Sequence, residues 1–219
     1  MSTDASDDVI GIYQRHAATF DEQRSRSLFE APWLDAFTDA LPGPKVLDLG
    51  CGTGVPMAAA LIEGGCAVTG IDGAAAMIDR ARRRFPRARW QVADMRHLPP
   101  LGRFDGVIAW HSFFHLPPDD QPAMIARFGA LLNPGGAVLF TSGTEHGHAM
   151  GQLGGEPLYH GSLDSAAYRD LLARAGLTVL RHVERDPDCG GATVWLAVRD
   201  ADPAPPDENA PGRAAQPCR

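Results

Sequence analysis

Cysteine is scarce in this 219-residue chain, and no two cysteines form a C-x-x-C pair. Four are too few for the disulfide framework of a small secreted domain, so a reducing compartment is expected. Cys189, in the stretch PDCGG, is predicted to be a solvent-facing turn residue, because an activated thiol would need a nearby positive charge. The others are Cys51, Cys66 and Cys218.

The chain also lacks a long apolar run and an excess of positive charge. No stretch approaches the roughly 18 apolar residues of a membrane helix, and the first residues, MSTDASDDVIGIYQ, carry acids where a signal peptide carries basic residues. Lys and Arg total 20 against 27 Asp and Glu, so the net charge of -7 disfavours a nucleic-acid partner. These absences predict a cytoplasmic protein without a membrane partner.

Short β-type runs alternate with amphipathic helical runs over residues 7–200, which are predicted to form a single domain. Such alternation predicts an α/β, doubly wound, mostly parallel seven-stranded Rossmann-like sheet. The last two strands follow each other directly through RDPDCGGAT (185–193), which predicts an antiparallel last strand. Residues 1–6 and 201–219, with few large apolar groups, are predicted to be disordered.

Two stretches are not needed by this sheet. Residues 7–40 contain two helical runs ahead of the first strand, and residues 143–162 form a glycine-rich insertion between a strand and a helix. Ligands of open α/β sheets bind beyond the carboxyl ends of the strands, the side from which the insertion springs. We therefore expect an N-terminal helical lid over 7–40 and an insertion over the site at 143–162.

A glycine-rich loop follows the first predicted strand in VLDLGCGTG (46–54). Its glycines run G-x-G-x-G, and Val55 stands where a dinucleotide fingerprint has its last glycine. Asp48 precedes the first glycine by two residues, where its charge would repel a pyrophosphate and attract an ammonium or sulfonium group. The loop therefore indicates a cation-bearing ligand.

Two further acids end the next two predicted strands. Asp72 closes AVTGID about 20 residues on, the spacing at which a carboxylate reaches ribose hydroxyls. Asp94 closes QVADM, where its carboxylate suits adenine N6 and the N–H of Met95 suits a ring nitrogen. Ribose, adenine and a positively charged amino-acid end describe S-adenosylmethionine. The alternative, that Asp48 and Asp72 only cap helices, explains each acid singly but not their placement at successive strand ends.

These motifs resemble those of the class I S-adenosylmethionine-dependent methyltransferases of small-molecule type, over roughly residues 10–199. The resemblance rests on VLDLGCGTG, VTGIDGAAAMIDRARRRFP, QVADMRHLP, FDGVIAWHSFFHL and LNPGGAVLF. The stretch IYQRHAATFDEQR resembles the family's lid helix, which implies that Tyr13 lies near the methyl-transfer site. The resemblance implies cofactor contacts from Gly50, Cys51 and Gly52 to the methionine part, from Asp72 to the ribose, from Gly73 and Met77 to the adenosine, and from Asp94 and Met95 to adenine.

The segment WHSFFHLPPDD after the fourth predicted strand supplies the candidate catalytic groups. Methyl transfer from a sulfonium is an in-line displacement, and an acceptor that loses a proton can use histidine as a base. His111 is the first candidate because it lies nearer the strand end than His115; the alternative is that each only binds backbone groups. Trp110 is a candidate cofactor contact. With Phe113 and Phe114 it forms either an apolar wall for an aromatic acceptor or part of the core.

The predicted function is methyl transfer from S-adenosylmethionine to oxygen or nitrogen of a small metabolite, without a metal. The insertion histidines have no accompanying cysteine or carboxylate cluster, so acceptor contacts or solvent exposure are favoured over a metal site. Protein or RNA methylation and non-catalytic S-adenosylmethionine binding are alternatives, and a nicotinamide oxidoreductase ranks third. The insertion residues concerned are His146, His148, Tyr159 and His160.

Overall fold

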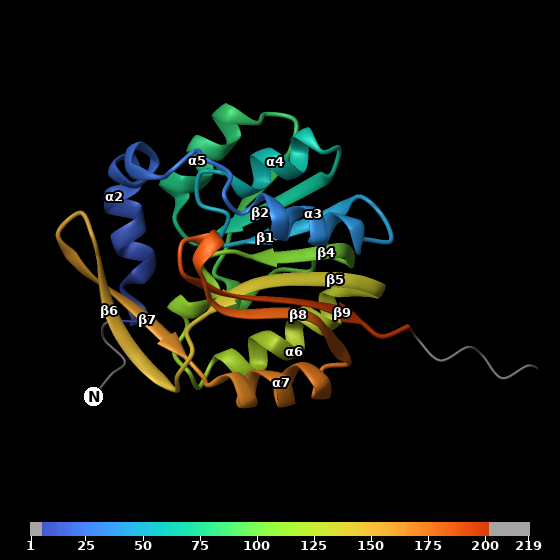
Figure 1. Cartoon of the computed structure of the whole chain (residues 1–219). Helices are drawn as coiled ribbons and strands as arrows, with labels where there is room; N and C mark the ends of the chain where they lie inside the picture. The colour runs from blue at the N-terminus through green and yellow to red at the C-terminus, as the bar shows by residue number, and fades with distance from the viewer. Residues whose placement is uncertain (1–5, 202–219) are drawn as a thin grey trace, which may run out of the picture.

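A seven-stranded sheet in the order β3-β2-β1-β4-β5-β9-β8 forms the centre of the computed structural model, which describes residues 6–201 (Figure 1). The strands from β3 to β5 are parallel, and β9 is antiparallel to both β5 and β8. The predicted doubly wound sheet with an antiparallel last strand is confirmed. The strands are β1 Lys45–Leu49, β2 Ala67–Asp72, β3 Arg89–Val92, β4 Phe104–Ala109, β5 Leu132–Ser142, β8 Leu177–Asp186 and β9 Ala192–Arg199.

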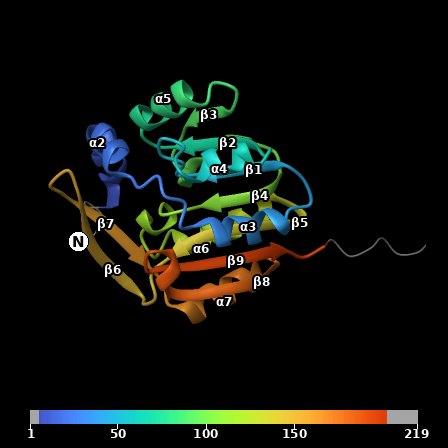
Figure 2. The same ribbon diagram turned by 45° about the horizontal axis from the view of Figure 1, so that its top comes forward.

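The central strands are apolar on both faces, because helices cover both. In β5, Val138 packs in the layer under α6 and α7, and Leu139 packs in the layer under α3, α4 and α5. Figures 1 and 2 show these helices on opposite sides of the sheet. Helix α7 begins at Asp164, whose carboxylate accepts from the N–H of Ala167 at 2.8 Å. The helices are α2 Val9–Gln23, α3 Ala31–Asp39, α4 Met57–Glu63, α5 Ala75–Arg84, α6 Gln121–Leu131 and α7 Ser165–Arg174.

The glycine-rich insertion folds as an antiparallel hairpin, β6 (Gly147–Leu153) and β7 (Glu156–Ser162), which forms a sheet of its own. Gly154 and Gly155 make its two-residue turn, which requires the positive φ angles of 59° and 87° that they adopt. The hairpin lies beside α2 in both views (Figures 1 and 2). Their shared apolar cluster contains Val9, Ile12, Leu153, Leu158 and Tyr159.

The ends of the chain are described only in part. Of the stretches predicted to be disordered, residues 1–5 and 202–219 lie outside the described residues, whereas Ser6 is helical and buried. Within residues 6–201, no helix combines the length and the apolar character that crossing a membrane requires.

Candidate active site

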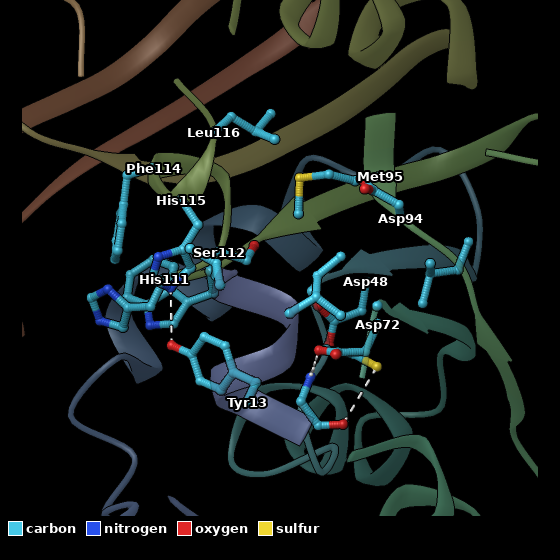
Figure 3. Close-up of a pocket in the computed structure, with 18 of the residues that line it drawn as sticks. Tyr13, Asp48, Asp72, Asp94, Met95, His111, Ser112, Phe114, His115 and Leu116 are labelled. Carbon is cyan, nitrogen blue, oxygen red and sulfur yellow. Dashed lines mark hydrogen bonds between the residues drawn. The ribbon is translucent and has the colours of Figure 1, made fainter. Parts of the chain in front are cut away.

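A pocket lies at the carboxyl ends of the parallel strands, between the loop after β1 and helix α2. Figure 3 shows Tyr13, His111 and His115 on one side of it and the three aspartates on the other. Residues that are distant in sequence therefore share one cavity. The predicted site residues that line it are Tyr13, Asp48, Gly50, Cys51, Gly52, Asp72, Gly73, Asp94, Met95, Trp110, His111 and His115.

Asp72 closes the glycine loop onto the end of β2. Its two carboxylate oxygens accept from the backbone N–H of Gly52 at 2.9 Å and of Ala74 at 2.8 Å. The loop is further fixed by Ser112, whose hydroxyl donates to the carbonyl of Leu49 at 2.6 Å. The aspartate therefore orders the loop as well as facing the pocket.

Gly50 cannot carry a side chain in this arrangement. Its φ is 72°, and an added Cβ would lie 2.2 Å from Cβ of Ser112. The backbone of the first glycine therefore packs directly against the segment after β4. This close approach joins the cofactor loop to the part of the chain that carries His111.

Asp48 is buried and Asp72 is half-buried, and neither forms an ion pair among the described residues. Burial raises the pKa of Asp48 to about 7, and the charge of Asp72 adds to the rise. Burial likewise raises the pKa of Asp72 to about 6, against the opposing effect of its bonds from Ala74 and Gly52. Two carboxylates that line one pocket without a cation partner fit a ligand that brings positive charge of its own, as S-adenosylmethionine does.

The adenine end of the predicted site differs in detail from the expectation. Burial raises the pKa of Asp94, but hydrogen bonds from the backbone and guanidinium of Arg96, at 2.8 and 2.7 Å, hold it below its usual value. Met77 does not belong to the described pocket lining. It is buried with Ala17 and Ala74, because its position on α5 faces α2.

His115 and Tyr13 form a fixed pair. Nδ1 of His115 lies 2.8 Å from the carbonyl oxygen of Tyr159, which can only accept, so this nitrogen carries the proton. Nε2 then accepts from the Tyr13 hydroxyl at 2.9 Å (Figure 3). Burial lowers the pKa of His115 to about 4 and raises that of Tyr13, so both are neutral at physiological pH. The Tyr13 oxygen keeps its lone pairs for a ligand.

His111 differs because its ring has no hydrogen bond among the described residues. Its backbone adopts a φ of 51°, and its N–H donates to the hydroxyl of Thr141 at 2.9 Å. The ring stands 5.3 Å from that of Trp110 and 5.9 Å from that of Phe114. Burial lowers its pKa to about 4, and the charge of Arg24 contributes. His111 is therefore a neutral imidazole with both nitrogens available to a ligand.

Of the remaining aromatic and histidine candidates, some line the pocket and others do not. Phe114 and His160 line the pocket with Trp110, whereas Phe113 is fully buried in the core. His148 is exposed on the hairpin, and His146 is exposed just before it. Within residues 6–201, no group of three or more His, Cys, Asp or Glu side chains is arranged to hold a metal ion.

The prediction of a solvent-facing Cys189 is wrong. The side chain is 1% exposed, in a short 3-10 helix after β8. Burial raises its pKa to about 11, so the thiol is unreactive. The turn itself is present; its cysteine points inward because it packs with the apolar cluster under α3.

Two ion-pair groups that fasten α2 were not foreseen from the sequence. Glu156 of the hairpin binds Arg15 and His16, each at 2.6 Å. At the other end of α2, Asp21 accepts from Thr53 of the glycine loop at 2.8 Å and binds Arg84 of α5 at 3.0 Å. Charged residues so far apart in sequence carry no pairing signal, because their contact depends on where α2 packs.

A doubly wound sheet with a glycine-rich loop at its carboxyl edge is typical of proteins that bind a nucleotide cofactor. The family described as "Methyltransferase domain" matches residues 46–136. A malonyl-(acyl-carrier protein) O-methyltransferase of Serratia marcescens is 30% identical over 74% of this chain and 67% of its own length. The chain therefore belongs to the class I S-adenosylmethionine-dependent methyltransferases, as its motifs indicated.

Two other similar proteins are an O-methyltransferase and a solved methyltransferase structure. A ubiquinone biosynthesis O-methyltransferase of Acinetobacter baylyi is 31% identical over 50% of this chain. The match covers 48% of that relative, so the chain spans about half its length. The magnesium protoporphyrin IX methyltransferase of Synechocystis PCC 6803, solved with bound S-adenosylmethionine, has a TM-score of 0.61 at 20% identity, over 91% of this chain and 86% of its own. That likeness shows the shared fold.

Proposed function

We propose that this protein transfers the methyl group of S-adenosylmethionine to an oxygen or nitrogen atom of a small metabolite. The observation that carries the proposal is one pocket that is lined both by the carboxylates at the strand ends and by Tyr13, His111 and His115. Helix α2 and the hairpin both contribute side chains to this pocket, which supports an acceptor that binds inside it rather than along a surface. Two relatives are named O-methyltransferases, which favours oxygen.

The cofactor would supply an electrophilic methyl group on a positively charged sulfur. Asp48 and Asp72 would hold the charged and hydroxyl-bearing parts, and Asp72 keeps the glycine loop in place through Gly52 and Ala74. Gly50, Cys51 and Gly52 would border the methionine part. Gly73, Asp94 and Met95 would border the adenosine, with Asp94 oriented by Arg96. Trp110 would close the apolar side.

His111 is the proposed proton acceptor for an acceptor group that carries a proton. Its ring nitrogens have no partner among residues 6–201, and it lines the pocket beside Trp110 and Phe114. His115 is engaged on both nitrogens, so its proposed role is to orient Tyr13 toward the methyl group. Most of the rate gain would come from alignment of the acceptor, since the displacement needs no covalent intermediate.

Calorimetry with S-adenosylhomocysteine and with NAD tests the cofactor assignment. The protein should bind the first and not the second. Asp72→Ala should weaken binding strongly, because it removes both the ligand contact and the two loop hydrogen bonds. Asp79→Ala, on the exposed side of α5, is the matched control. Binding of NAD alone would contradict the proposal.

Turnover of labelled S-adenosylmethionine separates the alternatives. Label transferred into metabolites of an extract supports the proposal, label in protein or RNA supports macromolecular methylation, and binding without transfer supports a sensor. The cytoplasmic location stays a prediction from the sparse cysteines.

A further inference from the structure

A group of aromatic rings, here called the aromatic wall, lines one side of the pocket. Figure 3 shows Tyr13, His111, Phe114 and His115 across the pocket from the strand-end aspartates. The centroids of neighbouring rings lie between 4.9 and 5.9 Å apart, so the rings are in continuous contact. Most of them are half-buried, unlike the fully buried Phe113, and keep an uncovered face. The aromatic wall consists of Tyr13, Trp110, His111, Phe114, His115 and His160.

The hairpin contributes His160 of β7 to this wall. The His160 ring lies 4.9 Å from the ring of Phe114 and 5.1 Å from that of His115. Gly151 on the neighbouring strand leaves room for it, because an added Cβ on Gly151 would lie 2.7 Å from the His160 ring. The residue therefore belongs to the pocket although it lies in an insertion outside the central sheet.

The aromatic wall carries no net charge. Burial lowers the pKa of its three histidines and raises that of Tyr13, so all four side chains are neutral at physiological pH. The two arginines of the pocket lining are paired with acids. Arg24 pairs with Glu30. Arg96 pairs with Asp94. A charged acceptor group placed against the wall would therefore lose hydration without gaining an unpaired counter-ion.

Two imidazoles of the wall are available to polar groups of a ligand. The rings of His111 and His160 make no hydrogen bond among residues 6–201, whereas both nitrogens of His115 are engaged. A neutral imidazole offers one N–H donor and one acceptor nitrogen, and a hydroxyl group also donates and accepts. A hydroxyl group can therefore pair with either tautomer of these histidines.

We propose that the methyl acceptor is an uncharged aromatic compound with a hydroxyl group, bound with its ring against the aromatic wall. The inference rests on the proposed function and narrows its class of acceptor. Ring-to-ring contacts favour an aromatic ligand over a saturated one, and the uncharged wall disfavours a carboxylate, a phosphate or an ammonium group. On transfer, the hydroxyl oxygen bonds to the methyl carbon as the carbon–sulfur bond breaks, and the hydroxyl proton passes to a ring nitrogen of His111.

Calorimetry on the S-adenosylhomocysteine-loaded protein at neutral pH tests the inference with three probes of similar size. These are 4-methylphenol, 4-methylcyclohexanol and 4-methylbenzoate, which differ in aromatic character or in charge. The phenol should bind about 10-fold more tightly than each of the others. Equal or tighter binding of the cyclohexanol or the benzoate, or binding of no probe at millimolar concentration, would overturn the inference. Failure of the wild type to bind S-adenosylhomocysteine would instead overturn the proposed function.

Matched variants test whether the preference comes from the aromatic wall. Phe114→Leu and His160→Leu each remove one ring and keep an apolar side chain. In each variant, the preference for 4-methylphenol over 4-methylcyclohexanol should fall by about 3- to 10-fold, while the affinity for S-adenosylhomocysteine stays unchanged. His146→Leu, at an exposed side chain outside the pocket lining, is the control and should change neither quantity. An unchanged preference in both Phe114→Leu and His160→Leu would contradict the inference.

Discussion

At the scale of single residues, the site is a set of ionisable groups whose pKa values are shifted toward the neutral form. Asp48 and Asp72 have raised pKa values of about 7 and 6, and His111 and His115 have lowered values of about 4. Burial is the first cause in each case, because a charge in a dry pocket loses its hydration. A charged ligand that binds in this pocket should therefore shift the protonation equilibria of these side chains.

The affinity for S-adenosylhomocysteine should rise as the pH is raised from 5 to 8. Asp48 ionises over this range and then attracts the ligand's ammonium group. The stability of the ligand-free protein should instead fall as the pH rises. A carboxyl group with a raised pKa binds more protons in the folded state than in the unfolded state, so its contribution to stability is lost between about pH 4 and 7. In Asp48→Asn, the affinity for S-adenosylhomocysteine should depend less on pH. Its melting temperature should rise relative to that of the wild type as the pH is raised. Equal pH profiles for the two proteins would contradict the role of Asp48.

His111→Ala should spare cofactor binding and slow transfer by about 100-fold or more, because a positioned base contributes at least that much. Since the pKa of His111 is about 4, this residue should cause no inflection in turnover between pH 6 and 8. Turnover of a defined acceptor and calorimetry with S-adenosylhomocysteine measure the two effects. His146→Ala, at an exposed side chain just before the hairpin, is the control. Unchanged turnover in His111→Ala would remove the base assignment.

At the scale of elements, helix α2, the expected lid, is held at both ends by side-chain contacts. The hairpin holds it through Glu156, and the glycine loop and α5 hold it through Asp21. The first contact is solvent-facing, with 37% of the Glu156 side chain exposed, so salt should weaken it. We therefore expect the contact with the hairpin to loosen before the contact with the glycine loop.

Glu156→Gln should loosen the lid without unfolding the domain. Backbone hydrogen exchange in β6 and β7 should become several-fold faster, and KM for the acceptor should rise, while the melting temperature changes little because the lost ion pairs are exposed. Glu145→Gln, at an 87% exposed side chain, is the control and should show neither effect. Faster exchange across the central sheet as well would contradict a local lid.

At the scale of the whole molecule, the hairpin is an addition to a complete sheet. Its two strands pair only with each other, and its ends are adjacent, since an added Cβ on Gly143 would lie 2.9 Å from Cβ of Ser162. The fold therefore closes without it. The hairpin does supply His160 to the pocket and the Tyr159 carbonyl that orients His115.

Replacing residues 145–160 with a short Gly-Ser linker should keep the sheet and most of the affinity for S-adenosylhomocysteine. The melting temperature should fall, because Val9 and Ile12 of α2 lose apolar partners. Turnover should be lost, since His115 is no longer oriented. Circular dichroism, calorimetry and labelled methyl transfer measure the three effects. Loss of cofactor binding in a folded variant would place the hairpin in the cofactor site instead.

The sequence by itself determined the order of strands and helices along the chain and the positions of the acids at the strand ends. Periodicity and glycine spacing are local properties, so the doubly wound sheet and the positions of Asp48, Asp72 and Asp94 could be read without coordinates. The antiparallel last strand was equally local, because no helix separates β8 from β9.

Only the tertiary structure decided which side chains share the pocket and in which protonation state. The hairpin, the fixed Tyr13–His115 pair, the inward Cys189 and the presence of Arg24 in the pocket wall all depend on contacts between distant segments. Burial, which shifts each pKa, is likewise a property of packing rather than of sequence. The chain encodes its cofactor loop locally, whereas the shape and charge of the acceptor side arise when α2 and the hairpin pack over the sheet.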